Sequence, residues 1–238
     1  MPERFSASKA SRLMQCQASA NLDLAIEGWT PPVVDPTKDN AANRGTHIHE
    51  IFAEAMSLST TNLRKFSAAV AYVADLRNLR RFTVLIEQPV VAEWLASKPG
   101  TTADLVLYVA DEIHIVDLKT GKIPVSAVDN EQLLFYAATY GHLAPKAKGV
   151  HLHIVQPWAD VLECWFADAM TIAQFMNDAA QAESEILAGS TQFMPGDACM
   201  FCEANPHGRG LKGHPFCPAM LSILYPEIGI DEDEFFKE

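Results

Sequence analysis

Two apolar runs in the middle of the chain predict the element around which the rest is organised. Residues 102–110 and 112–118 are rich in valine, isoleucine, leucine and tyrosine, and a short polar turn separates them. Runs of this length and composition indicate the two strands of a β-hairpin. Side chains two apart on a strand share a face, so Asp117 and Lys119 project together, and pairing across the turn brings Asp104 towards Asp117. The hairpin therefore gathers two carboxylates and one ammonium group.

Taken alone, Asp117 and Lys119 also fit a surface salt bridge at the end of a strand. That is the ordinary explanation of so short a motif. The neighbouring elements decide between the two interpretations.

Helical patterns precede the hairpin. A first helix, capped by a serine, is expected over residues 6–26, and a loop with three prolines follows it at residues 28–39. A second helix is expected over residues 41–56, with His49 on it, and a third over residues 63–81.

The elements around and after the hairpin mix strands and helices. Residues 82–94 are typical of a strand interrupted at Pro89, which suggests an edge strand or a bulge. A helix over residues 128–142 places Gln132 and Tyr136 on one face, because they are four residues apart. Two strands joined by a turn, and then a long amphipathic helix, are expected at residues 150–156, 161–166 and 170–187.

Composition narrows the class of protein. With 238 residues, of which 49% are apolar, the chain can bury a large core. No apolar run has the length of a membrane span and the N-terminus lacks the apolar core of a signal peptide, so we expect a cytoplasmic protein with no membrane partner. The formal net charge of −12 argues against a broad basic groove for nucleic acid. It leaves room for a narrow site where a metal ion screens the phosphate.

We expect a single domain over residues 1–225 and an acidic tail over residues 226–238. The domain divides into a helical N-terminal part, a core and a cysteine-rich segment, at residues 1–81, 82–190 and 191–225. The tail ends in DEDEFFKE, with five acidic residues against one lysine. Such runs are usually disordered and solvated.

The cysteine-rich segment has many glycines and prolines and no apolar periodicity, so we expect a bound metal to order it. Cys199 and Cys202 form a C-x-x-C pair, in which a tight turn offers both thiolates to one ion, and Cys217 supplies a third thiolate. In a cytoplasmic chain, such cysteines indicate a metal site rather than a disulfide framework.

The fourth ligand has several candidates. Cys16 is the better of the two remaining cysteines, because Cys164 lies inside an apolar strand, where a buried free thiol is expected. His207 and His214 lie within the cysteine-rich segment, so a zinc site of three cysteines and one histidine competes with an iron–sulfur cluster. Spacing alone does not separate the two.

The order of these motifs resembles the RecB-like branch of the PD-(D/E)XK nucleases. The motifs are GTHIHE on the second helix, GTTAD and VDLKTGK on the hairpin strands, QLLFYA on the next helix, and the cysteines near the C-terminus. Within that branch the chain is similar, over residues 6–217, to the small stand-alone phage exonucleases and to the CRISPR-associated exonuclease of spacer acquisition. The resemblance implies an α/β fold with a short mixed sheet flanked by helices. It also implies a cysteine-ligated metal cluster that joins the N- and C-terminal segments.

The resemblance further implies roles for the site residues. A bound Mn²⁺ or Mg²⁺ would activate a water molecule and relieve phosphoryl charge, and an imidazole ligand favours manganese. The metal ligands would be His49, Asp104, Asp117 and the backbone oxygen of Leu118. Lys119 would orient or deprotonate the water, and Gln132 and Tyr136 match the Q-x-x-x-Y helix that lines the active site in this branch.

By the same resemblance, a 4Fe-4S cluster would be held by Cys16, Cys199, Cys202 and Cys217, with a mainly structural role. Fourteen residues separate Cys202 from Cys217, which is more than is usual in the branch. Zinc therefore stays the alternative metal.

These implications predict a metal-dependent DNA exonuclease that acts on single-stranded or free DNA ends in phage or bacterial recombination or repair. A phage-encoded enzyme would work in the cytoplasm of the bacterial host, and a homo-oligomer and a recombination or helicase partner are further expectations. The alternative is a non-catalytic DNA-binding or assembly module that keeps the nuclease fold, and a weaker one is a zinc-stabilised structural protein. Catalysis is favoured by the complete set of His49, Asp104, Asp117 and Lys119, because a module without chemistry has no need of all four.

Overall fold

The structure is a computed structural model, and it describes residues 5–30, 46, 48–50, 52–53, 82–109, 111–143, 145–205 and 216–224. The chain divides into two compact units. The sheet unit comprises Ser6–Ser8 and Asp35–Asn177, and the cysteine unit comprises Met1–Phe5, Lys9–Val34 and Asp178–Glu238. The predicted single domain over residues 1–225 stays a prediction.

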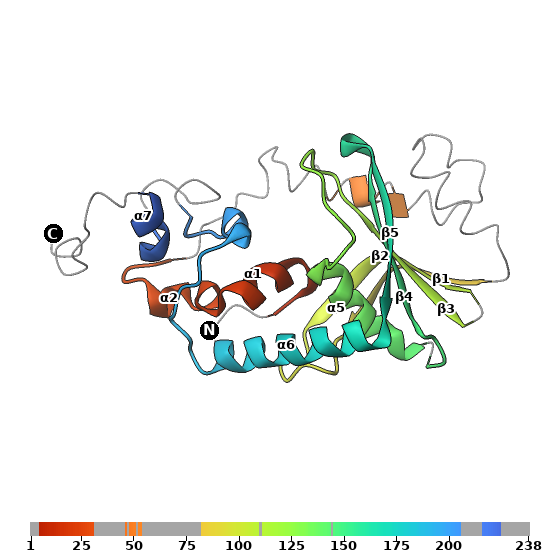
Figure 1. The fold of residues 1–238 in the computed structure, drawn as a ribbon, viewed down its shortest axis with the longest axis horizontal. Helices are drawn as coiled ribbons and strands as arrows, with labels where there is room; N and C mark the ends of the chain where they lie inside the picture. The colour runs from red at the N-terminus through yellow and green to blue at the C-terminus, as the bar shows by residue number, and fades with distance from the viewer. Residues whose placement is uncertain are drawn as a thin grey trace. The chain divides into compact units, whose positions relative to one another are not determined.

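The sheet unit is built on a five-stranded mixed sheet in the order β1-β2-β3-β4-β5 (Figure 1). Neighbouring strands are antiparallel except for β3 and β4, which are parallel. The strands are β1 (Phe82–Val91), β2 (Gly100–Val109), β3 (Glu112–Leu118), β4 (Gly149–Gln156) and β5 (Val161–Asp168). The predicted α/β class with a short mixed sheet is therefore confirmed.

The predicted hairpin is β2 and β3. Its register pairs Val109 with Glu112 at the turn and Leu105 with Val116 farther along. The odd-numbered residues of β3 and the even-numbered residues of β2 therefore share one face, as strand alternation requires. This register brings Asp104 beside Asp117, as the hydrophobic pattern predicted.

Strand β1 is at the edge of the sheet, as expected for a strand that contains proline. The predicted interruption at Pro89 is wrong in position, because Pro89 pairs with Thr102 inside the ladder. The ladder breaks instead at Glu87, which has a φ of 44° and faces Asp104 across the pair of strands. An edge strand tolerates a missing proline N–H more easily than a left-handed residue, since only the latter changes the direction of the backbone.

Helices α5 (Glu131–Tyr140) and α6 (Ala169–Leu187) lie on the same side of the sheet (Figure 1). The side chain of Asn130 caps α5 by accepting a hydrogen bond from the Leu133 N–H at 3.1 Å. The ring of Trp94 packs against Phe135 of α5 and Phe175 of α6, at centroid distances of 5.2 and 6.0 Å. Both helices were predicted, and α6 ends before Gly189, whose φ of 80° suits the end of a helix.

The single helix predicted over residues 6–26 is wrong. The structure has four short pieces there. They are η1 (Ala7–Lys9), of which Ala7 and Ser8 belong to the sheet unit, and then α1 (Ala10–Gln15), η2 (Gln17–Ala20) and α2 (Leu22–Ala25) in the cysteine unit. The breaks are at Cys16, which is extended with φ −139° and ψ 95°, and at Asn21. Tertiary hydrogen bonds explain the second break, because the Asn21 amide donates to the carbonyl oxygens of Ile186 and Ser190 at 3.1 Å each.

The cysteine-rich segment contains two short helices that the sequence pattern did not predict, η6 (Asp197–Phe201) and α7 (Pro218–Leu224). Buried residues of this segment pack against the N-terminal pieces in one apolar cluster. Its members are Leu22, Ile26, Trp29, Cys202, Ala204 and Cys217.

Several predictions fall outside the described residues. They concern the helix over residues 63–81, the acidic tail, and the two histidines His207 and His214. Of the helix predicted over residues 41–56, the described positions are helical, and Phe52 on its predicted packing stripe is buried. Within the described part of the chain, no helix is both long and apolar enough to cross a membrane.

Candidate metal-binding active site

Two buried carboxylates lie side by side on the face of the sheet that α5 covers. Asp104 on β2 and Asp117 on β3 are 6% and 3% exposed. The Oδ2 atom of Asp104 accepts a hydrogen bond from the Leu118 N–H at 2.6 Å, which ties the two strands together at the site. Burial raises the pKa of the Asp104 carboxyl, against the lowering effect of its hydrogen bond to His49.

Asp117 has one satisfied and one incompletely satisfied oxygen. Its Oδ1 accepts a hydrogen bond from Gln132 Nε2 at 3.0 Å. Its Oδ2 lies 2.9 Å from Lys119 Nζ, but the ammonium is outside hydrogen-bonding geometry, and this buried oxygen has no hydrogen-bond donor among the described residues. A buried carboxylate oxygen without a directed partner is costly. It is therefore a natural ligand position for a cation.

The lysine is held in place by the helix above it. Lys119 Nζ donates to Gln132 Oε1 at 2.5 Å, and Gln132 Nε2 also donates to the Tyr136 hydroxyl at 2.9 Å. Burial, and next the charge of Asp117, raise the pKa of Tyr136 far above its usual range. Tyr136 is thus a neutral hydroxyl that fixes Gln132. The predicted pairing of Gln132 and Tyr136 on one helix face, with contact to the lysine, is present in this geometry.

His49 and Glu87 complete the group on the other side of Asp104. His49 Nδ1 lies 3.0 Å from Asp104 Oδ1 and 3.7 Å from Glu87 Oε1. The hydrogen bonds to Asp104 and then to Glu87 raise the pKa of His49 to about 10. The ligand atoms of these three residues all lie within 4.8 Å of one another, so they could hold a metal ion.

Glu87 was missed by sequence reasoning. Its signal is positional, since it stands directly opposite Asp104 in the register of β1 and β2. That register could be known only once the edge strand had been paired. The neighbouring Glu50 is exposed, as expected of a helical glutamate outside the site. The carbonyl oxygen of Leu118 as a metal ligand stays a prediction.

We call these residues the hairpin site: His49, Glu87, Asp104, Asp117, Lys119, Gln132 and Tyr136. Carboxylate oxygens with one imidazole are a donor set that suits Mn²⁺ and related hard or intermediate divalent cations. The ammonium of Lys119 beside such an ion is placed to act on a bound water or on developing negative charge.

The cysteine unit contains a second candidate site, which we call the cysteine site. Its members are Cys16, Cys199, Cys202 and Cys217, and all four line one pocket. Two of the sulfur atoms accept backbone hydrogen bonds, from the Met194 N–H to Cys16 Sγ at 3.4 Å and from the Gly196 N–H to Cys199 Sγ at 3.3 Å. The segments that carry the thiols, far apart in the sequence, are thus brought to one place.

Burial makes two thiols of the cysteine site, those of Cys202 and Cys217, poor acids without a cation. It raises the pKa of Cys202 to about 11 and that of Cys217 in the same direction. Among the described residues, no three of the four sulfur atoms lie within 4.8 Å of one another.

The fifth cysteine differs from its predicted state. Cys164 is exposed rather than buried. It lies on the edge strand β5, where exposed and half-buried residues alternate because successive side chains point to opposite faces of the sheet. Apolar composition alone did not reveal that exposure.

The chain matches one protein family and is similar to several solved structures. A family model described as "Protein of unknown function (DUF2800)" matches residues 62–214. Among solved structures, SSO0001 is 13% identical, with 89% of this chain and 85% of that chain covered at a TM-score of 0.43. An alkaline exonuclease (LHK-Exo) from Laribacter hongkongensis is 14% identical, with 75% and 91% covered at a TM-score of 0.35. At these identities and TM-scores, neither similarity assigns a fold or an activity to this chain.

Proposed function

We propose that this chain, which belongs to the family described as Protein of unknown function (DUF2800), is a metal-dependent DNA nuclease with a PD-(D/E)XK core. The observation that carries the proposal is the pair of buried carboxylates, Asp104 and Asp117, with Lys119 Nζ 2.9 Å from Asp117 Oδ2. Without a metal, the protonated His49 and Lys119 offset the charge of the two buried carboxylates. A divalent cation could take the place of the His49 proton and bind the same oxygen donors.

The residues of the hairpin site fit such a cation. His49, Glu87 and Asp104 form the group whose ligand atoms lie within 4.8 Å of one another. Asp117 is not in that group, and its buried Oδ2 offers a further oxygen donor beside it. When bound, the ion would lower the pKa of a water molecule and neutralise charge on a phosphodiester. His49 must release its proton before it can bind the ion, so cation binding and deprotonation of His49 are linked.

The remaining residues position the reacting groups. Gln132 holds Lys119 through Oε1 and holds Asp117 through Nε2. The ammonium therefore has a defined place beside the metal ligands, from which it can orient the attacking water and stabilise charge on the phosphoryl oxygens. The orientation of the Gln132 amide is fixed by Lys119, which can only donate, and by Asp117, which can only accept, while the Tyr136 hydroxyl accepts a further hydrogen bond from Nε2.

The substrate we propose is DNA with free ends, single-stranded by preference. The net charge of −12 favours a local, cation-dependent contact with phosphate over a broad electrostatic groove. An exonuclease needs only such a local contact at the end of a strand. A role in phage or bacterial recombination or repair, and a homo-oligomeric or helicase-associated form, belong to the same proposal.

End-labelled single- and double-stranded DNA, incubated with Mn²⁺, tests the activity. The intact protein should release labelled nucleotides, and Asp117→Asn and Lys119→Ala should not. Asp160→Asn is the matched control, because Asp160 is an exposed loop residue with a φ of 54°, which asparagine also adopts. Binding of DNA without cleavage by the intact, metal-loaded protein would instead identify a non-catalytic binding module.

For the cysteine site we propose a 4Fe-4S cluster with a structural role. Support comes from the four cysteines, which line one pocket and match the order of the cluster ligands in the family that the sequence resembles. Iron and acid-labile sulfide should each be near four per chain after anaerobic purification, with visible absorbance that dithionite bleaches. One zinc per chain and no visible absorbance would refute the cluster and leave the nuclease proposal standing.

A further inference from the structure

The opposite face of β3 carries a second group of metal-ligating side chains. Glu112 and His114 are two apart on β3, and His151 and His153 are two apart on the parallel strand β4. His114 pairs directly with His151 in the register, so all four side chains project from the same face. Asp117 differs from His114 by an odd number of positions and therefore belongs to the other face.

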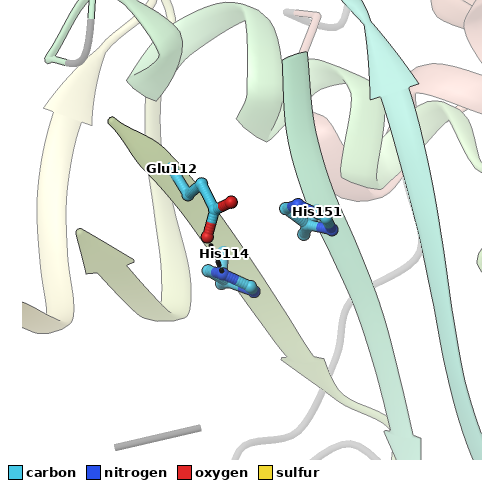
Figure 2. Close-up of side chains that lie close together, drawn as sticks. All are labelled: Glu112, His114 and His151. Carbon is cyan, nitrogen blue, oxygen red and sulfur yellow. Dashed lines mark ion pairs between the residues drawn. The ribbon is translucent and has the colours of Figure 1, made fainter. Parts of the chain in front are cut away.

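The distances within this group suit a shared ion. The ligand atoms of Glu112, His114 and His151 all lie within 4.8 Å of one another. Glu112 Oε2 is 3.9 Å from His114 Nε2, and Figure 2 shows the carboxylate of Glu112 extending along β3 to the edge of that ring. The rings of His114 and His151 lie 4.6 Å apart and nearly parallel.

A buried histidine, His153, contacts the ring of His114 and orients it. His153 is 1% exposed, and its Nε2 lies 3.1 Å from His114 Nδ1. If His114 binds a metal through Nε2, its proton must be on Nδ1, where it donates to His153 Nε2. Histidine ligands usually make such a hydrogen bond through the second ring nitrogen, which fixes the tautomer and the orientation of the ring.

We propose that Glu112, His114 and His151 form a second metal site, separate from the hairpin site, for a first-row transition ion of the zinc type. Two imidazoles and one carboxylate are a common three-ligand set for zinc, with water in the fourth position. The side chain of Glu112 is 65% exposed and that of His114 is 13% exposed. The site therefore combines a largely buried imidazole with a carboxylate that is accessible to solvent.

Binding requires one ring to turn. Parallel stacked imidazoles direct their lone pairs side by side rather than to one point. The half-buried ring of His151 lies 4.6 Å from that of His114 and 4.9 Å from that of Phe166, so turning it would require a shift against Phe166, whereas His114 is held by His153. The ion would then link β3 to β4, which form the parallel pair among the described strands. Strand β3 also carries Asp117.

Burial also keeps the rings in the form that binds metal. It lowers the pKa of His114, with the nearby His151 acting in the same direction, and it lowers the pKa of His153 to about 3. Neutral imidazoles need release no proton to coordinate an ion. The proposal itself stands on the distances and the shared face.

Equilibrium dialysis against buffered Zn²⁺ tests the site, with zinc counted per chain for the intact protein, Glu112→Gln and His151→Gln. Each variant should bind one zinc fewer, or bind that zinc more weakly. The loss of affinity should exceed the roughly 10- to 100-fold seen when a residue that only hydrogen-bonds to a metal ligand is changed. His142→Gln is the control, because His142 is an exposed histidine outside the group and should leave the count unchanged. Equal zinc binding by all four proteins would overturn the proposal.

If a variant folds poorly, anomalous diffraction at the zinc absorption edge tests the site with the intact protein alone. Crystals of the intact protein grown with equimolar zinc should show a peak within bonding distance of Glu112, His114 and His151. The absence of that peak from crystals that show zinc elsewhere would equally overturn the proposal. Neither result depends on nuclease activity, so failure here and failure of the proposed function can be told apart.

Discussion

The hairpin site and the cysteine site solve the problem of buried charge in different ways. In the hairpin site, Asp104 and Asp117 stand on two strands joined by a tight turn, and neighbouring side chains already offset part of their charge. In the cysteine site, Cys16 and Cys217 come from opposite ends of the chain, and burial keeps the Cys202 and Cys217 thiols protonated in the absence of a cation. The first site is therefore built by the fold, whereas at the second, under the proposed function, a metal would contribute to the stability of the fold.

Asp117→Asn tests most directly whether the hairpin site serves activity rather than stability. We expect DNA cleavage to fall by at least about a hundredfold, the effect of losing one preorganised electrostatic group. The free energy of unfolding should change far less than the activity, because the substitution removes the ion pair with Lys119 but also the repulsion between Asp117 and Asp104. Cleavage rates and urea denaturation of the same preparation measure both quantities. Loss of stability in parallel with activity would mean that the carboxylate is structural.

The reverse behaviour is expected of Cys202→Ser. If metal binding at the cysteine site contributes folding free energy, its loss should lower the thermal midpoint by on the order of 10 °C. Cleavage should then disappear only at temperatures where the protein unfolds. Cys164→Ser is the matched control, because Cys164 is exposed and lies outside the site, and its melting curve should coincide with that of the intact protein.

A smaller effect is expected from Glu87→Gln, which sharpens the boundary of the hairpin site. The Mn²⁺ concentration for half-maximal cleavage should rise by roughly 10- to 100-fold, as for other residues that support a metal ligand. The maximal rate at saturating Mn²⁺ should change little. A lower maximal rate with unchanged Mn²⁺ dependence would instead place Glu87 in contact with the substrate.

The smallest effect concerns pH in the metal-free protein. The hydrogen bonds to Asp104 and Glu87 raise the pKa of His49 from 6.5 to about 10. The stability that this proton provides is complete below pH 6.5 and is lost as the pH rises through about 10. With chelator present, His49→Gln should therefore be less stable than the intact protein at low pH, and the difference should shrink across that range. A difference that is constant with pH, or that His142→Gln reproduces, would contradict this assignment.

Local patterns predicted much of the sheet unit. The composition of residues 102–118 implied the hairpin, and its alternation placed Asp104, Asp117 and Lys119 together. The four-residue spacing of Gln132 and Tyr136 correctly placed both on one helix face. These features depend on contacts within a strand, a turn or a helix, where the sequence period is enough.

Other features depend on contacts that no local pattern contains. The first helix is broken at Asn21 because its side chain bonds carbonyl groups about 165 residues away. Glu87 joins the hairpin site because a left-handed residue on an edge strand faces Asp104. The exposure of Cys164 likewise follows from the place of β5 in the sheet rather than from its composition.

By itself, the sequence determined the period and length of the strands and helices, and with them the partners of the hairpin carboxylates, because these follow from short-range geometry. The assembled fold added three facts: which strand is at the edge, that Asp117 Oδ2 has no hydrogen-bond donor among the described residues, and that His114 meets His151 across a parallel pair. The physical reason is the same in each case. Burial and cross-strand register are properties of the assembled sheet, and a chain of residues specifies them only through the packing of segments that are distant in sequence.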